Sequence, residues 1–129
     1  AVDLDDKLFV ITVDEASRKD VKKISADILD AVERIKSGDA SARKLSPANI
    51  TITNLGSANI KQFTAIINPP ESAILAIGKI ASVPVVQNGR IVIADVADIT
   101  LSVDHRIVNG KYAATFLSEV VESIETNWK

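Results

Sequence analysis

The stretch SAILAIGKIASVPVVQNGRIVIADVADITLSVDH, Ser72 to His105, decides the fold expected for this chain. Aliphatic and β-branched residues fill it, which is typical of buried β-strands. Near its centre Asn88-Gly89 separates two apolar runs, and this pair favours the two-residue turn of a β-hairpin. The stretch therefore predicts an apolar strand over 72–80, a hairpin joining 84–86 to 91–94, and a strand over 98–104.

Further elements are predicted on both sides of this stretch. After it, Lys111 to Trp128 predicts a helix with one apolar face, formed by Tyr112, Phe116, Val120, Ile124 and Trp128. Before it, NITITN over 49–54 predicts a strand with both hydroxyls on one face. A helix is predicted from a capping box of Ser17 and Asp20 to a left-handed cap at Gly38, preceded by a strand over 7–13. These elements predict an α/β sandwich with a mixed or antiparallel sheet.

Composition excludes several classes of function. At 129 residues the chain is most simply one domain, and its net charge of −2 argues against binding to nucleic acid or to an anionic membrane. No apolar run is long enough to span a bilayer. Without cysteine there is no disulfide or thiolate site, and a single histidine leaves only carboxylates for a metal, so no metal is expected.

His105 is the only histidine, and it stands between Asp104 and Arg106. One interpretation is an ordinary histidine at a strand end, held by local charges. The other is a general base, because a neutral imidazole can take a proton from an alcohol or a thiol. In extended backbone Asp104 and Arg106 leave the face opposite His105, where they pair with each other, pair with other groups or remain solvated. The residues alone leave both interpretations open.

Several blocks of the sequence resemble one family. DHRIVNG over 104–110 is similar to the DHR-x-x-[DN]-G signature of the 2-oxoacid dehydrogenase acyltransferases, and TITNLG over 51–56 to their T-I-[ST]-[NS]-[LI]-G. FTAIINPPESAILAIGKI over 63–80 resembles a third block, and all blocks follow in family order. The resemblance implies a chloramphenicol-acetyltransferase-like two-layer sandwich with helices on one face of a mixed or antiparallel sheet. Residues 1–129 would be the C-terminal portion of the catalytic domain, with the lipoyl and peripheral subunit-binding domains absent.

The resemblance also implies an activity and roles for site residues. The family moves an acyl group between coenzyme A and a dihydrolipoyl group carried on a separate domain, without a metal. His105 stands at the general-base position and Thr53 at the position of the hydroxyl that stabilises the oxyanion. Asn109 would have a polar, geometric role, and Asp104, Arg106 and Gly110 would support the site. From the residues alone, an ordinary strand threonine is the favoured interpretation of Thr53, and a turn residue before Gly110 accounts for Asn109 almost as well.

The implied partners follow from the same resemblance. We expect a homotrimer and a higher core assembly, with His105 of one chain facing Thr53 of the next. The lipoyl domain, the dehydrogenase and the dihydrolipoamide dehydrogenase would be further partners, in a bacterial or archaeal cytoplasm or a mitochondrial matrix. Two alternatives remain: a non-catalytic assembly module, and a chloramphenicol-acetyltransferase-like enzyme. The DHR motif, in place of that group's His-His-x-x-x-Asp-Gly pattern, favours the acyltransferase.

Overall fold

The computed structural model describes residues 1–4, 7–39 and 47–127. The chain divides into two compact units, Ala1–Ala48 and Asn49–Lys129, and each is described by itself. Trp128, which the sequence places on the apolar face of the last helix, lies outside the described residues. Within the described ranges, neither α-helix has the length and apolar character that crossing a bilayer requires.

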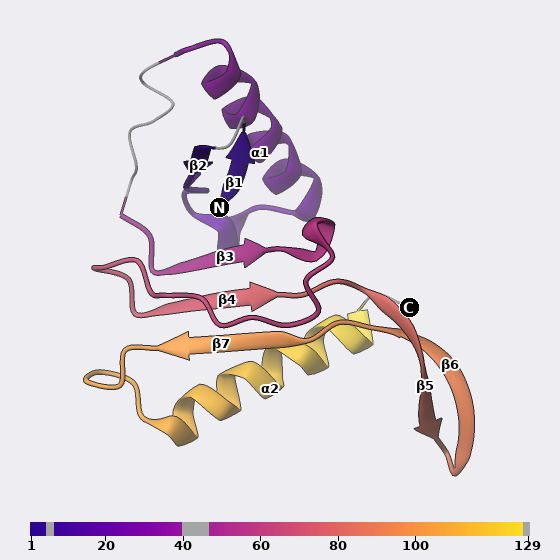
Figure 1. Ribbon diagram of the computed structural model, residues 1–129. Coiled ribbons are helices and arrows are strands. Elements are labelled where there is room, and N and C mark those ends of the chain that lie inside the picture. The colour runs from indigo at the N-terminus through magenta and orange to yellow at the C-terminus, as the bar shows by residue number, and fades with distance from the viewer. Residues whose placement is uncertain (5–6, 40–46, 128–129) are drawn as a thin grey trace. The chain divides into compact units, whose positions relative to one another are not determined.

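The first unit holds a short hairpin and one long helix (Figure 1). Strand β1 (Val2–Leu4) pairs antiparallel with β2 (Lys7–Phe9), so the strand predicted over 7–13 ends early, where its partner ends. Helix α1 (Val21–Lys36) follows the 3₁₀ turn η1 (Ala16–Arg18).

The two ends of α1 test the predicted caps. The predicted capping box is wrong, because Ser17 lies within η1 and Asp20 is itself the N-cap. The Asp20 carboxylate accepts a hydrogen bond from the backbone N–H of Lys23 at 2.7 Å. The left-handed conformation predicted for Gly38 is confirmed by its φ of +82°.

The second unit is built on a three-stranded mixed sheet, as predicted. Its strands are β3 (Ile50–Asn54), β4 (Ala73–Ile77) and β7 (Ile99–Val103), in the order β3-β4-β7. β3 and β4 are parallel, joined by the connection 55–72 with its 3₁₀ turn η3 (Gly56–Ala58), whereas β4 and β7 are antiparallel. Ile74, Leu75 and Ala76 are all buried, because β4 has a neighbour on each side.

The register separates two faces of this sheet. Thr51, Ile74 and Ser102 share one face, where the Ser102 hydroxyl donates to the carbonyl of Ala65 at 2.9 Å. Ile50, Ala73 and Val103 share the other face, and helix α2 (Gly110–Asn127) packs on that side against β7 (Figure 1).

Helix α2 forms as predicted, and its predicted apolar face is confirmed in part. On that face Val120 is half-buried and Phe116 is 38% exposed, while Tyr112 is 67% exposed and Ile124 is also exposed. Ala113, Leu117 and Val121, which the sequence did not indicate, are half-buried as well, because helical periodicity places them on a neighbouring stripe.

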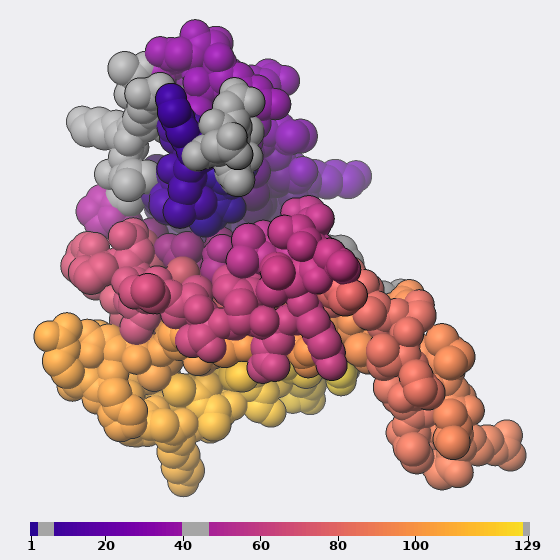
Figure 2. Space-filling view, in the orientation of Figure 1, coloured from indigo at the N-terminus to yellow at the C-terminus, as the bar shows by residue number. Residues whose placement is uncertain are grey.

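The predicted hairpin is confirmed. β5 (Ala81–Gln87) and β6 (Arg90–Val96) pair antiparallel around Asn88 and Gly89, whose φ values are +52° and +73°. Both central residues need positive φ in the primed turn that matches the twist of a hairpin. The hairpin projects from the rest of the second unit, in salmon and orange at the right of Figure 2.

Candidate functional site

His105 lies in a tight turn that follows β7. The backbone N–H of Asp104 donates to the carbonyl of Ser72 at 2.9 Å, which continues the sheet by one bond. The Asp104 carbonyl then accepts from Ile107 at 3.1 Å and Val108 at 3.0 Å, which closes the turn. The extended backbone predicted through His105 is therefore wrong. The imidazole is exposed on this turn and is open to a substrate.

Asp104 and Arg106 pair with each other across the turn, one of the arrangements expected from the sequence. Nη2 of Arg106 donates to Oδ2 of Asp104 at 2.6 Å, and Nε donates to Oδ1 at 2.9 Å. The side-chain hydrogen bonds from Arg106, followed by the bond from its backbone N–H, lower the pKa of Asp104 to about 2. The pair fixes the backbone on both sides of His105 and leaves the imidazole outside the ion pair.

The Asp104–Arg106 ion pair is expected to lose its contribution to stability in acid. The pKa of Asp104 in the folded chain is about 2, below its ordinary value of 3.8. The pair therefore contributes stability that is fully present above about pH 4 and is lost as the pH falls toward 2. We expect Asp104→Asn to lack this part of the acid transition when circular dichroism follows unfolding from pH 6 to 2. Identical acid transitions for the two proteins would contradict the role of the pair.

Asn109 and Gly110 connect the turn to α2. The side-chain Oδ1 of Asn109 accepts a hydrogen bond from the backbone N–H of Tyr112 at 2.9 Å. The backbone carbonyl of Asn109 accepts one from the backbone N–H of Ala113 at 3.0 Å. Asn109 thus caps the helix whose first residue is Gly110. The structure brings His105, Asp104, Arg106, Asn109 and Gly110 into one continuous turn.

Thr53 lies on β3 and shares a face with Thr51, as predicted for the two hydroxyls. Thr51 is buried, and its hydroxyl donates to Oε2 of Glu71 at 2.5 Å. Thr53 is half-buried, and its hydroxyl has no hydrogen-bond partner in the part of the chain that the structure describes. Of the two hydroxyls, that of Thr53 is the one open to an outside acceptor.

Thr53 and the His105 turn are far apart within one chain. Thr53 pairs with Ala76, which pairs with Thr100, four residues before Asp104. Strand geometry then separates the Cα atoms of Thr53 and Asp104 by roughly 13 Å along the sheet and roughly 10 Å across it, about 16 Å in all. One chain therefore does not bring its own threonine and histidine to the same substrate atom.

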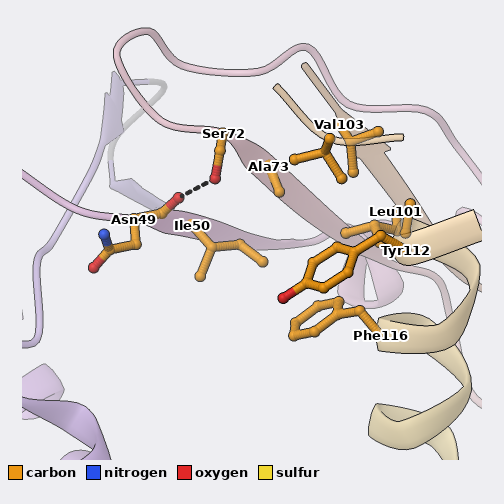
Figure 3. Close-up of a pocket in the computed structure, with 10 residues that line it drawn as sticks. Asn49, Ile50, Ser72, Ala73, Leu101, Val103, Tyr112 and Phe116 are labelled. Atoms are coloured by element: carbon orange, nitrogen blue, oxygen red, sulfur yellow. Dashed lines mark hydrogen bonds between the residues drawn. The ribbon is translucent and has the colours of Figure 1, made fainter. Parts of the chain in front are cut away.

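The second unit has a cavity of about 230 Å³ on the α2 side of the sheet (Figure 3). Ten residues line it, most of them apolar, and the rings of Tyr112 and Phe116 extend into it from α2. Neither His105 nor Thr53 lines the cavity, and Thr53 points from the opposite face of the sheet. The cavity is therefore separate from the candidate site.

Sequence reasoning missed Glu71, which is only 6% exposed. The available signal was a glutamate directly after Pro69-Pro70 and before an apolar strand. Among the residues described, no cluster of three or more histidine, aspartate or glutamate side chains is arranged to hold a metal.

Fold and site together define a mixed α/β domain that presents an exposed imidazole on a turn and a separate hydroxyl on a strand. Residues 1–129 match the family model of the 2-oxoacid dehydrogenases acyltransferase (catalytic domain). The chain belongs to this family, which confirms the resemblance seen in its motifs.

A curated relative supports this assignment over nearly the whole chain. The dihydrolipoyllysine-residue acetyltransferase component of the pyruvate dehydrogenase complex of Rickettsia felis is 35% identical over 126 residues. The match covers 98% of this chain and 31% of the relative. The chain thus spans about a third of the length of that relative.

Solved structures of similar proteins share the fold. A probable dihydrolipoamide acetyltransferase of Listeria monocytogenes has a TM-score of 0.91 and 30% identity, covering 96% of this chain and 53% of that one. The dihydrolipoamide acetyltransferase of Azotobacter vinelandii, studied for the catalytic role of a serine, a histidine and an asparagine, has a TM-score of 0.85 and 28% identity, covering 95% and 50%. The cubic core of a pyruvate dehydrogenase multienzyme complex has a TM-score of 0.85 and 30% identity, covering 95% and 51%.

Proposed function

We propose that this chain is the part of an acyltransferase catalytic domain that carries the general base and the oxyanion donor. The reaction moves an acyl group between coenzyme A and a dihydrolipoyl group within a 2-oxoacid dehydrogenase complex. One observation carries the proposal. In the Azotobacter enzyme the histidine follows the serine by 52 positions and the asparagine follows the histidine by four, and the same spacings separate Thr53, His105 and Asn109.

The chemistry that these residues support is direct exchange between two thiols. A thiol with a pKa near ~8.5 is mostly protonated at neutral pH, so a base must remove its proton before the sulfur attacks a thioester. His105 accepts that proton as the sulfur adds to the carbonyl carbon. Thr53 donates its hydroxyl to the oxyanion of the tetrahedral intermediate. His105 then returns the proton to the departing sulfur, and no acyl-enzyme is needed.

Local geometry supports these roles. His105 is exposed, and its turn is closed by backbone bonds and by the Asp104–Arg106 pair, so the backbone that carries the imidazole has a defined conformation. Asn109 anchors the other end of the same turn through its cap on α2. Threonine keeps the hydroxyl of the serine in the relative, and its β-methyl restricts the rotamers of that hydroxyl.

We further propose that each site forms between two chains of a homotrimer. The separation of about 16 Å between Thr53 and Asp104 in one chain, estimated from strand geometry, requires a second copy to supply the missing group. A head-to-tail contact repeated around a threefold axis gives three identical sites. The solved cubic core of a similar protein supports a higher assembly. We propose the lipoyl domain, the dehydrogenase and the dihydrolipoamide dehydrogenase as further partners.

Mixing two inactive variants tests the shared site. Thr53→Ala alone is expected to reduce the rate about 10²–10³-fold through loss of the oxyanion donor, and His105→Ala alone removes the base. In trimers co-expressed from both variants, about a quarter of the sites combine an intact histidine with an intact threonine from the neighbouring chain. We expect about that fraction of wild-type turnover. Mixed trimers no more active than either variant alone would contradict a shared site.

A second candidate, a non-catalytic assembly module, is favoured by the β5–β6 hairpin. Its residues Val86, Ile91 and Ile93 are 76%, 78% and 72% exposed, and such apolar surface is typical of contacts between chains. Turnover of acetyl-CoA with dihydrolipoamide that is lost in His105→Ala would support the enzyme. A trimer without any turnover would support the module. For either candidate, we propose the chloramphenicol-acetyltransferase-like sandwich as the fold of the assembled domain.

A further inference from the structure

Glu71 is a buried carboxylate without a cationic partner among the described residues, since none of their ion pairs includes it. Two neutral donors satisfy it instead. Oε2 accepts the hydroxyl of Thr51 at 2.5 Å, and Oε1 accepts the side-chain amide of Asn68 at 3.1 Å. Thr51 lies two residues before Thr53 on the same strand and the same face. The carboxylate therefore ties the strand of Thr53 to the turn that begins at Asn68.

The same turn is also bonded to the residue before His105. Its last residue, Ser72, accepts the backbone N–H of Asp104 at 2.9 Å through its carbonyl. The backbone N–H and the hydroxyl of Ser72 both donate to the carbonyl of Asn49 at 3.3 Å, and Figure 3 shows the bond from the hydroxyl. Residues 68–72 thus contact β3 on one side and the His105 turn on the other.

We propose that Glu71 is a positioning residue that fixes the strand of Thr53 relative to the His105 turn within each chain. The inference rests on the proposed function, in which every chain contributes its histidine to one site and its threonine to another. A displacement of about 1 Å in either group is enough to reduce a rate about 100-fold. Glu71 controls both positions because its two oxygens bond β3 and the 68–72 turn at once.

Two substitutions at Glu71 test whether the hydrogen bonds of its side chain are needed. Glu71→Gln keeps an acceptor for the Thr51 hydroxyl, and the Asn68 amide can rotate to present its oxygen to the new N–H₂. Glu71→Ala removes both acceptors. The matched control is Asp95→Ala in the hairpin, which removes another hydroxyl–carboxylate bond of 2.5 Å, from Ser82, that does not contact either group of the site.

The first measurement needs no activity. Because the chain has one histidine, its imidazole Cε1–Hε1 gives a single NMR cross-peak that needs no assignment. We expect Glu71→Ala to shift or broaden this peak, and Glu71→Gln and Asp95→Ala to leave it in place. An unshifted, sharp peak in folded Glu71→Ala would overturn the proposal, whatever the chain's activity proves to be.

The second measurement is steady-state exchange between acetyl-CoA and dihydrolipoamide, normalised to the folded fraction. We expect Glu71→Ala to lower kcat about 10–100-fold with little change in KM, and Glu71→Gln to restore most of it. Equal loss in Glu71→Gln and Glu71→Ala would overturn positioning by hydrogen bonds. If Glu71→Ala does not fold, Thr51→Val removes one of the two hydrogen bonds at nearly constant side-chain shape. An unchanged His105 peak in Thr51→Val would likewise overturn the proposal.

Discussion

Replacing His105 by alanine is expected to reduce acyl exchange between acetyl-CoA and dihydrolipoamide by roughly 10²–10⁴-fold, the usual contribution of a positioned general base. The loss is expected to fall on kcat, because in the proposed mechanism the imidazole acts on the proton of the attacking thiol and contributes little to the binding of either substrate. Within the described residues, the neighbouring ionisable side chains Asp104 and Arg106 are bonded to each other, so no nearby group replaces the base. The measurement is the initial rate followed by release of coenzyme A.

The matched control for this change is Ile107→Ala. Ile107 is 68% exposed in the same turn and contributes its backbone N–H, which alanine retains, to the carbonyl of Asp104. We expect nearly wild-type exchange from this variant. Equal rates for His105→Ala and the wild-type chain would exclude His105 as the base.

Gly78→Ala is expected to have the largest effect on stability. A Cβ at this position would lie 1.8 Å from the carbonyl oxygen of Lys61 and 2.7 Å from its carbonyl carbon. The backbone has little room to yield, because Gly78 donates to Asp98 at 3.0 Å and Lys79 donates to Ile60 at 2.8 Å. We expect a loss of roughly 3–5 kcal/mol in the free energy of unfolding, or failure to fold, since overlap with backbone atoms is among the costliest changes.

Urea unfolding followed by circular dichroism measures this loss. Gly110→Ala is the matched control, because a Cβ there meets no atom within 4 Å and its φ is not positive. We expect the control to change the free energy of unfolding by no more than about 1 kcal/mol, the difference in helix propensity between glycine and alanine. A wild-type urea midpoint for Gly78→Ala would show that the close contact between Gly78 and the backbone of Lys61 is not part of the stable fold.

Much of the second unit was predictable from local patterns. Asn88-Gly89 between apolar runs predicts the hairpin, and the run after Ser72 predicts a buried strand. The boundaries were less accurate, because a strand extends only as far as its partner and a cap forms only where the backbone turns. Both errors in the first unit, at 10–13 and at Ser17, have this cause.

The residues of the candidate site were proposed from the sequence motifs, and their geometry was predictable only in part. The order of the motifs indicates the family, and the Asp104–Arg106 pair was one of the expected arrangements. The turn at His105 was not expected, because it depends on the bond between Asp104 and Ser72, 32 residues earlier in the chain. The burial of Glu71 depends likewise on Thr51, 20 residues before it.

The order of residues by itself determined the family and indicated the candidate site residues, since a motif is a property of neighbours along the chain. Only the tertiary structure decided that Thr53 and His105 lie at separate places and that Glu71 is bonded to the strand of Thr53. The reason is the register of β3, β4 and β7. A register exists only after strands pair and bury their side chains, so it sets distances that no local pattern contains.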